Sequence, residues 1–223
     1  LAGFGHSTNP MQDYDLEFFS SQIATFIREM DLGPTIVVGH SIGGAASLDA
    51  FLRFPDEVQS VVLINSAGFD VPGPDLDEDL DRMGRSLFNY QGDSDWERLV
   101  ATVIETPLKK LYTDEKWYSQ KEVDRLAANL RTGSGRRAHL EVLRNFVPTN
   151  VVGRIMAKAD ELRIRSKSER RGQRDILVLW GEQDPWFPPR MAEFFRSRIP
   201  GAKVAILKGT GHYAHVEQAD TVA

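Results

Sequence analysis

The stretch 35-TIVVGHSIGGAASL-48 places a serine between glycines directly after a run of β-branched residues. Residues 35–38 have the pattern of a short buried strand, and residues from about 41 to 53 have the pattern of a helix that ends before Pro55. Residues 39–43 therefore match G-x-S-x-G at a strand-to-helix turn. Such a turn forces its serine, here Ser41, into a strained backbone conformation and exposes the hydroxyl above the carboxyl-terminal edge of a sheet.

The neighbours of Ser41 fit the same turn. Glycines at 39 and 43 are expected because side chains there would collide with the neighbouring strand and helix. The backbone N–H of Ile42 opens the helix and is the predicted donor to a developing oxyanion. A glycine-rich phosphate loop is the alternative, but no lysine follows as a P-loop requires. Ser41 is therefore the predicted nucleophile.

A serine hydroxyl is a weak nucleophile until a base takes its proton. The chain has five histidines, which are His6, His40, His139, His212 and His215. His212, in 209-GTGHYAHVEQ-218, follows a late strand through a glycine-rich loop that can carry an imidazole over the sheet edge, so it is the predicted base. His215 is expected to make a structural hydrogen bond, and His40 lies inside the turn.

An imidazole base needs a carboxylate that orients it and stabilises the imidazolium. Asp184, in 180-WGEQDPWFP-188, directly follows a predicted strand. Glu182 is the rival acid, but it falls closer to the end of that strand. The chain order Ser41, Asp184, His212 is that of the nucleophile, acid and histidine in α/β-hydrolases.

The periodicity of the chain divides it into three parts. Residues 1–68 contain a helix, a strand, a second helix and the strand 58–64, which is the spacing of a parallel βαβ unit. Residues 69–172 lack strong strand patterns and have helical spacing, with a capping box at Ser119, so they are predicted to form a helical cap. Residues 173–223 return to the α/β pattern. We expect the first and third parts to form one core domain.

Composition excludes several other classes of protein. The chain has 223 residues, of which 41% are hydrophobic, and a net charge of -5, which argues against a nucleic-acid partner. It has no cysteine, so a disulfide framework and a thiolate metal site are excluded. No apolar run reaches the roughly 18 residues that crossing a bilayer requires, so we expect a soluble protein. Its compartment is left open, with the cytoplasm as the first expectation.

Five segments together resemble the α/β-hydrolase superfamily over nearly the whole chain. They are GFGHST at 3–8, GHSIGG at 39–44, FPDEVQSVVLINSAG at 54–68, LVLWGEQDPWFP at 177–188 and GTGHYAHVEQ at 209–218. Within that superfamily the chain looks most like small lipases and esterases of the monoacylglycerol-lipase type. The resemblance implies an α/β fold with a mostly parallel sheet and a helical cap. It also implies that the first strands and the last helix of the family are missing, because GFG-x-S normally follows the fourth strand.

The implied activity is hydrolysis of a small, apolar carboxylic ester through an acyl-enzyme, without cofactor or metal. Phe4, His40, Trp186 and Phe187 are the predicted substrate-binding residues. Aromatic side chains of the cap are further candidates for an acyl pocket, namely Phe88, Tyr90, Trp96, Trp117 and Tyr118.

Two alternatives stay open. A carbon–carbon bond hydrolase of ring-cleavage products uses the same three residues and a similar cap, although those enzymes often have Trp and Asn where this chain has Tyr213 and His40. A non-catalytic ligand-binding protein on the same scaffold is the other alternative, and an intact triad argues against it.

Overall fold

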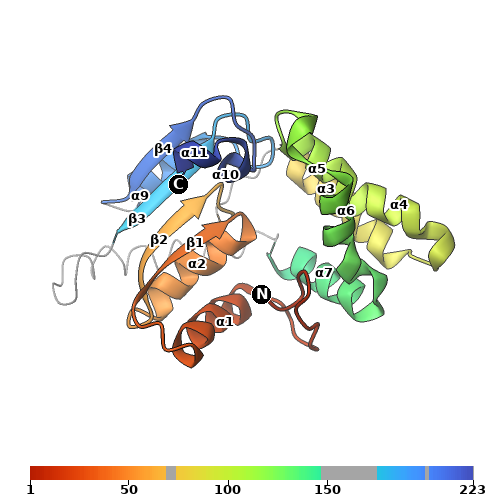
Figure 1. Cartoon of the computed structure of the whole chain (residues 1–223), viewed down its shortest axis with the longest axis horizontal. Helices are drawn as coiled ribbons and strands as arrows, with labels where there is room; N and C mark the ends of the chain where they lie inside the picture. The colour runs from red at the N-terminus through yellow and green to blue at the C-terminus, as the bar shows by residue number, and fades with distance from the viewer. Residues whose placement is uncertain (69–73, 147–174, 199–200, 223) are drawn as a thin grey trace.

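The computed structural model describes residues 1–68, 74–146, 175–198 and 201–222. The strands of these residues form one parallel sheet in the order β1-β2-β3-β4 (Figure 1). The strands are β1 (Thr35–His40), β2 (Val58–Ile64), β3 (Ile176–Gly181) and β4 (Lys203–Leu207). The prediction of an α/β fold with a parallel sheet is confirmed, and the strand predicted at 58–64 has those bounds.

One face of the sheet packs against α1 (Leu16–Glu29), α2 (Ile42–Arg53) and α9 (Arg190–Arg198) in the largest apolar cluster. Alternate residues of the strands supply this face, since side chains of a strand point in turn to opposite sides. Val61 and Val178 are almost fully buried there. The α2 helix begins directly after β1, as the glycine-rich turn predicts.

The opposite face carries the residues in between. Ile64, Leu179 and Leu207 form a smaller cluster with Ala214, which belongs to α10 (Ala214–Glu217). The short helix α11 (Ala219–Val222) follows it along the chain and contributes Val222. Both faces near the carboxyl ends of β2, β3 and β4 are therefore covered, which holds the loops after these strands in place.

β1 lies at one edge of the described sheet. Its neighbour is β2, and on the face opposite α1 and α2 its side chains are open to solvent. Ile36 is 60% exposed and Val38 is 63% exposed. An apolar edge strand of this kind favours pairing with a further strand.

Between β2 and β3 the described chain is helical, as predicted. The longer elements are α3 (Pro74–Phe88), α4 (Trp96–Val100), α5 (Thr106–Leu111), α6 (Gln120–Ala127) and α7 (Gly133–Phe146). The segments that join them are the 3₁₀ turns η1 (Asp93–Asp95), η3 (Glu115–Trp117) and η4 (Ala128–Arg131) and the π-helical turn η2 (Ala101–Glu105). Ser119 caps α6, with its side chain accepting the N–H of Glu122 as the capping box predicts.

We call α3 to α7 the cap helices. They share an apolar cluster of their own and stand beside the carboxyl-terminal edge of the sheet (Figure 1). The remainder of the predicted cap, residues 147–172, lies outside the described residues. The division into a core and a cap stays a prediction.

Candidate active site

Ser41 lies at the turn between β1 and α2. Its backbone has φ 53° and ψ -122°, a left-handed conformation that costs about 1–3 kcal/mol for a residue other than glycine. Hydrogen bonds hold the turn: the N–H of Ser41 donates to the carbonyl of Ile64 at 3.0 Å, and the carbonyl of Ser41 accepts the N–H of Ala67 at 2.9 Å. The strained turn is therefore fixed by the end of β2 and by the loop after it.

The two glycines that flank the serine turn, Gly39 and Gly43, differ in how much space a side chain would have. A Cβ at Gly39 would lie 2.4 Å from the carbonyl oxygen of Gly43 and 2.5 Å from the Oγ of Ser47, so the predicted collision is real there. The same expectation is wrong for Gly43, where a Cβ would meet nothing within 4 Å. Gly43 faces an open cavity instead, and the crowded second glycine is Gly44, against Ser66.

Asp184 and His212 are hydrogen-bonded to each other in a buried position. The Nδ1 of His212 lies 2.7 Å from the Oδ2 of Asp184, and the two residues are 1% and 4% exposed respectively. The other oxygen of Asp184 accepts the backbone N–H groups of Trp186 at 2.9 Å and Phe187 at 3.0 Å. With the Nδ1 proton held by the carboxylate, Nε2 is the nitrogen left to accept a proton.

Asn65 is a residue of this site that the sequence argument did not identify. Its amide Nδ2 donates to the Oδ2 of Asp184 at 2.7 Å, and its Oδ1 accepts the N–H of Gly181 at 3.2 Å. It is fully buried and has a positive φ of 42°. The sequence feature that could have identified Asn65 is its position, because it is a polar residue directly after the apolar strand β2. Glu182, the rival acid, instead accepts the N–H of Gly209 at 3.2 Å.

A cavity of about 560 Å³ lies between the core and the cap helices, and both Ser41 and His212 line it. The wall from the cap is mostly aliphatic and comes from Leu80, Met83, Val103, Ile104, Pro107, Leu108, Leu111, Leu126, Leu130, Val142 and Leu143. The space beside Ser41 is therefore suited to an apolar chain.

The predicted substrate-binding residues divide into two groups. Phe4, His40 and Trp186 line the cavity. Phe187 is 7% exposed and is absent from the described wall. Its ring packs against the ring of His212, with centroids 5.4 Å apart.

The cap aromatics predicted for an acyl pocket are also absent from the described wall. Tyr90, Trp96, Trp117 and Tyr118 pack on the apolar cluster of the cap, and Phe88 is 72% exposed. Aliphatic side chains take the place that the sequence argument gave to aromatic ones.

Ile42 is the first residue of α2, and it lines the cavity. The first N–H groups of a helix have no acceptor within the helix. Those of Gly44 and Ala45 turn back to the carbonyl of Ser41, at 2.9 and 3.3 Å. The N–H of Ile42 is thus positioned at the start of a helix, where negative charge is favoured.

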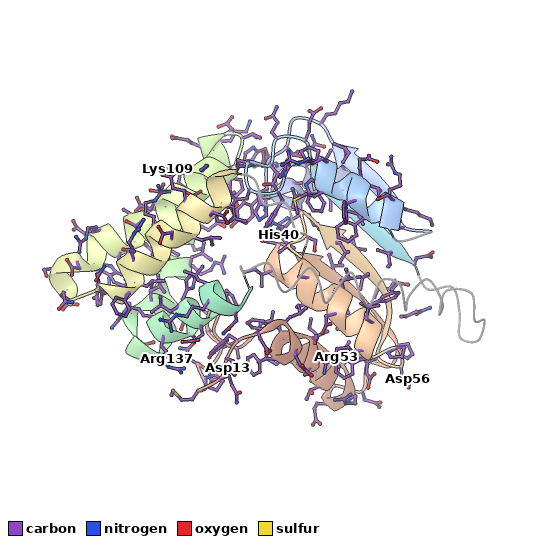
Figure 2. The ribbon with its side chains drawn as sticks, turned by 180° about the vertical axis from the view of Figure 1, so that it is seen from behind. Asp13, His40, Arg53, Asp56, Lys109 and Arg137 are labelled. Carbon is purple, nitrogen blue, oxygen red and sulfur yellow. The ribbon has the colours of Figure 1, made fainter. Side chains whose placement is uncertain are left out.

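His40 connects the turn at Ser41 to residues 208–213, the loop that carries His212, which we call the histidine loop. Its Nε2 lies 2.9 Å from the carbonyl oxygen of His212, which makes Nε2 the protonated nitrogen of His40. Its ring is 4.6 Å from the rings of both His212 and His215. Burial, and then the two neighbouring imidazoles, hold the pKa of His40 well below its ordinary value, so it is neutral. Figure 2 shows His40 where the core faces the cap.

His215 does not make the structural hydrogen bond expected of it within the described residues. Its Nδ1 is buried and has no partner there. Burial and the neighbouring His212 lower the pKa of His215.

The cap is hydrogen-bonded to the loop that carries His212. The N–H of His212 donates to the carbonyl of Leu111 at 2.9 Å, at the end of α5. Glu217 accepts the N–H of Gly211 at 2.9 Å and, through its second oxygen, the N–H and hydroxyl of Thr113. The bonds to Leu111 and Thr113 connect segments about a hundred residues apart, so the position of His212 depends on the cap as well as on the sheet.

The described residues contain no group of three or more His, Cys, Asp or Glu side chains that could hold a metal ion. Within the same residues, no helix is long and apolar enough to cross a membrane.

Comparison with known proteins places this architecture in a family. A family model described as alpha/beta hydrolase fold matches residues 1–219. Lipase 1 of Psychrobacter immobilis is 28% identical over 229 residues, which cover 100% of this chain and 64% of the lipase, so the chain spans just under two thirds of that relative.

Solved structures agree on the fold. An α/β hydrolase fold protein from Burkholderia ambifaria has a TM-score of 0.76 at 16% identity, covering 100% of this chain and 76% of that one. A meta-cleavage product hydrolase from Pseudomonas fluorescens IP01 has a TM-score of 0.65 at 17% identity, covering 100% and 74%. With its parallel sheet, its serine turn and its family match over residues 1–219, the chain belongs to the α/β-hydrolase fold family.

Proposed function

We propose that the protein is a serine hydrolase that cleaves carboxylic esters through an acyl-enzyme, with Ser41 as nucleophile, His212 as base and Asp184 as the orienting acid. The observation that carries the proposal is the buried His212–Asp184 pair at 2.7 Å, opening on the same cavity as the strained Ser41. A strained serine and an oriented imidazole on one wall are the arrangement that acyl transfer requires.

The chemistry follows from the protonation of His212. Its Nε2 takes the proton of the Ser41 hydroxyl while Oγ bonds to the ester carbonyl carbon, and the Ile42 N–H donates to the oxyanion. The bond from carbon to the alcohol oxygen then breaks, and the alcohol leaves with the proton from Nε2. Water, deprotonated by the same nitrogen, attacks the acyl-enzyme and releases the acid together with free Ser41.

The substrate is proposed to be an ester with an apolar chain. Support comes from the aliphatic wall of the cavity and from the relative named Lipase 1. No step of this reaction needs a cofactor or a metal ion.

The test is a substrate panel on the full-length protein. We expect turnover of p-nitrophenyl esters of 4 to 10 carbons, and a loss of kcat of up to about a millionfold in Ser41→Ala or His212→Ala if the triad acts as one unit. Residual activity above a tenth of wild type in either variant would reject the assignment. Turnover of a ring-cleavage dienone with no turnover of esters would favour the carbon–carbon hydrolase, and turnover of neither by a folded protein would favour a binding protein.

A further inference from the structure

His139 is a polar side chain in the apolar part of the cavity wall. It belongs to α7, and neighbours on the same wall are Val142 and Leu143 of that helix. Its ring packs edge-on against Phe4, with centroids 6.4 Å apart. The imidazole therefore lies among apolar groups while facing the space that Ser41 also faces.

Within the described residues, the imidazole of His139 makes no hydrogen bond and no ion pair. Burial is the sole cause that lowers its pKa, to about 4, so no charged group acts on it and the ring is neutral near pH 7. A neutral imidazole has one donor and one acceptor nitrogen. The side chain is half-buried and lines the cavity, so an oxygen of a bound substrate can reach a ring nitrogen there.

Three other polar side chains of the wall, His40, Trp186 and Asn129, have hydrogen-bond partners. The Nε2 of His40 bonds to the carbonyl of His212, and the Nε1 of Trp186 donates to Asp79 at 2.8 Å. The amide of Asn129 donates to the carbonyl of Gly3 and pairs with the side chain of Asn9.

Tyr213 and Arg125 occupy a different, charged part of the wall. Arg125 is exposed to solvent. Burial and Glu122 raise the pKa of the Tyr213 hydroxyl to about 12, while Arg125 acts to lower it. Charged groups therefore act on Tyr213, and its ring also stacks on Tyr112, whereas burial alone acts on His139.

We propose that His139 is a hydrogen-bonding anchor for a second oxygen of the substrate, beyond the ester that Ser41 attacks. The substrate class is then an ester whose chain carries a hydroxyl, carbonyl or ether oxygen at the point where the chain reaches His139 of α7. Such an ester is preferred to a plain alkyl ester. The proposal rests on the proposed function and adds a specificity to it. The substrate oxygen bonds to a ring nitrogen of His139 that has no partner among the described residues. A site that hydrogen-bonds a substrate oxygen discriminates against the analogue that lacks it.

The test is the ratio of kcat/KM for matched ester pairs on the full-length protein. The pairs are p-nitrophenyl esters of hydroxylated and plain acyl chains of 4 to 8 carbons, and butyrate esters of hexanol and hexane-1,6-diol, which place the hydroxyl on either side of the scissile bond. We expect one hydroxylated member to be preferred by about tenfold, and the preference to disappear in His139→Phe, which keeps a ring against Phe4. His139→Gln restores part of it by supplying a donor and an acceptor.

The matched control is Arg144→Gln, an exposed change on the same helix, which is expected to retain the wild-type ratio. A thermal unfolding curve of each variant excludes loss of fold as the cause. Equal ratios in wild type and His139→Phe for every pair would overturn the anchor. If plain esters are still hydrolysed and a fluorophosphonate still labels Ser41, the anchor alone has failed; if neither occurs in wild type, the proposed function has failed.

Discussion

The two oxygens of Asp184 have different partners, and this difference fixes the orientation of His212. One oxygen accepts two backbone N–H groups of its own loop, and the other accepts both His212 Nδ1 and the amide of Asn65. A carboxylate with four donors cannot rotate without breaking several charge-assisted hydrogen bonds. Asn65 is therefore expected to act through Asp184 on the direction of the imidazole.

Replacing Asn65 by Ala removes one donor to Asp184 and leaves the N–H of Gly181 without its side-chain acceptor. We expect kcat/KM for ester hydrolysis to fall about 10- to 100-fold and the free energy of unfolding to fall by about 1–3 kcal/mol. Steady-state kinetics and urea unfolding measure the two effects. The control is Asn89→Ala, an exposed position, which is expected to change neither. Wild-type kinetics in Asn65→Ala would show that Asp184 needs no support from β2.

The glycines of the serine turn offer a matched pair of substitutions. Gly39→Ala places a methyl group 2.4 Å from the carbonyl oxygen of Gly43, so we expect a loss of about 2 kcal/mol or more of folding free energy. Gly43→Ala meets open space and gains helix propensity, so its change is expected to be under about 1 kcal/mol. Equal losses measured by denaturant unfolding would contradict the difference in crowding.

At this scale the sequence predicted Ser41, Asp184 and His212 because each follows a strand in a short local pattern, and the structure brings Asp184 and His212 into contact. Asn65 and the bond from His40 to the carbonyl of His212 escaped prediction. Both depend on which loops meet at the sheet edge, and no local pattern carries that information.

Among the elements, the contact between the cap helices and the histidine loop has the most consequence. Glu217 of α10 binds the backbone of its own loop and Thr113, which follows α5. Tyr213 stacks on Tyr112 of the same segment, with centroids 4.5 Å apart and planes 18° apart. The end of the cap next to α5 is thus fixed to the loop that presents His212.

Glu217→Gln replaces one of the two carboxylate oxygens by an amide NH2 group, which donates and cannot accept. The hydrogen bonds that this oxygen accepts in the wild type are therefore lost. We expect kcat to fall by about tenfold or more with a smaller change in KM, because His212 is displaced while the apolar wall remains. The control is Glu193→Gln on the exposed side of α9, with unchanged constants. A change in KM alone would mean that the cap acts on binding and not on the position of His212.

The periodic elements were predictable, since α1, α2, β2 and α6 follow from apolar spacing and capping residues. The bonds of Glu217 to Thr113 and of His212 to Leu111 were not, because they join segments about a hundred residues apart. The aliphatic wall of the cavity depends in the same way on how α3, α5 and α7 pack. Composition alone therefore led to an acyl pocket lined by cap aromatics, which the described wall does not contain.

For the whole molecule, three partly buried histidines make stability depend on pH. The pKa of His139 in the folded chain is about 4, against an ordinary value of 6.5, and burial lowers the pKa of His40 and His215 in the same direction. Between pH 6.5 and 4 the unfolded chain binds protons that the folded chain does not. Folding free energy is therefore lost as pH falls through this window.

We expect the urea midpoint to fall as pH is lowered from 7 to 4.5, and His139→Phe to flatten that fall by removing a contribution of up to about 3 kcal/mol. Unfolding curves at half-unit pH steps measure it. The same substitution at the exposed His6 serves as the control. An identical pH dependence in wild type and His139→Phe would show that folding does not lower the pKa of His139.

The central claim of the account is that Ser41 is activated by His212 across the cavity, and its most direct measurement is covalent labelling of the full-length protein with a fluorophosphonate, followed by mass mapping. The account predicts a single adduct on Ser41, none in Ser41→Ala, and labelling at least about a thousandfold slower in His212→Gln. An unlabelled but folded wild type, an adduct on another residue, or undiminished labelling in His212→Gln would contradict it.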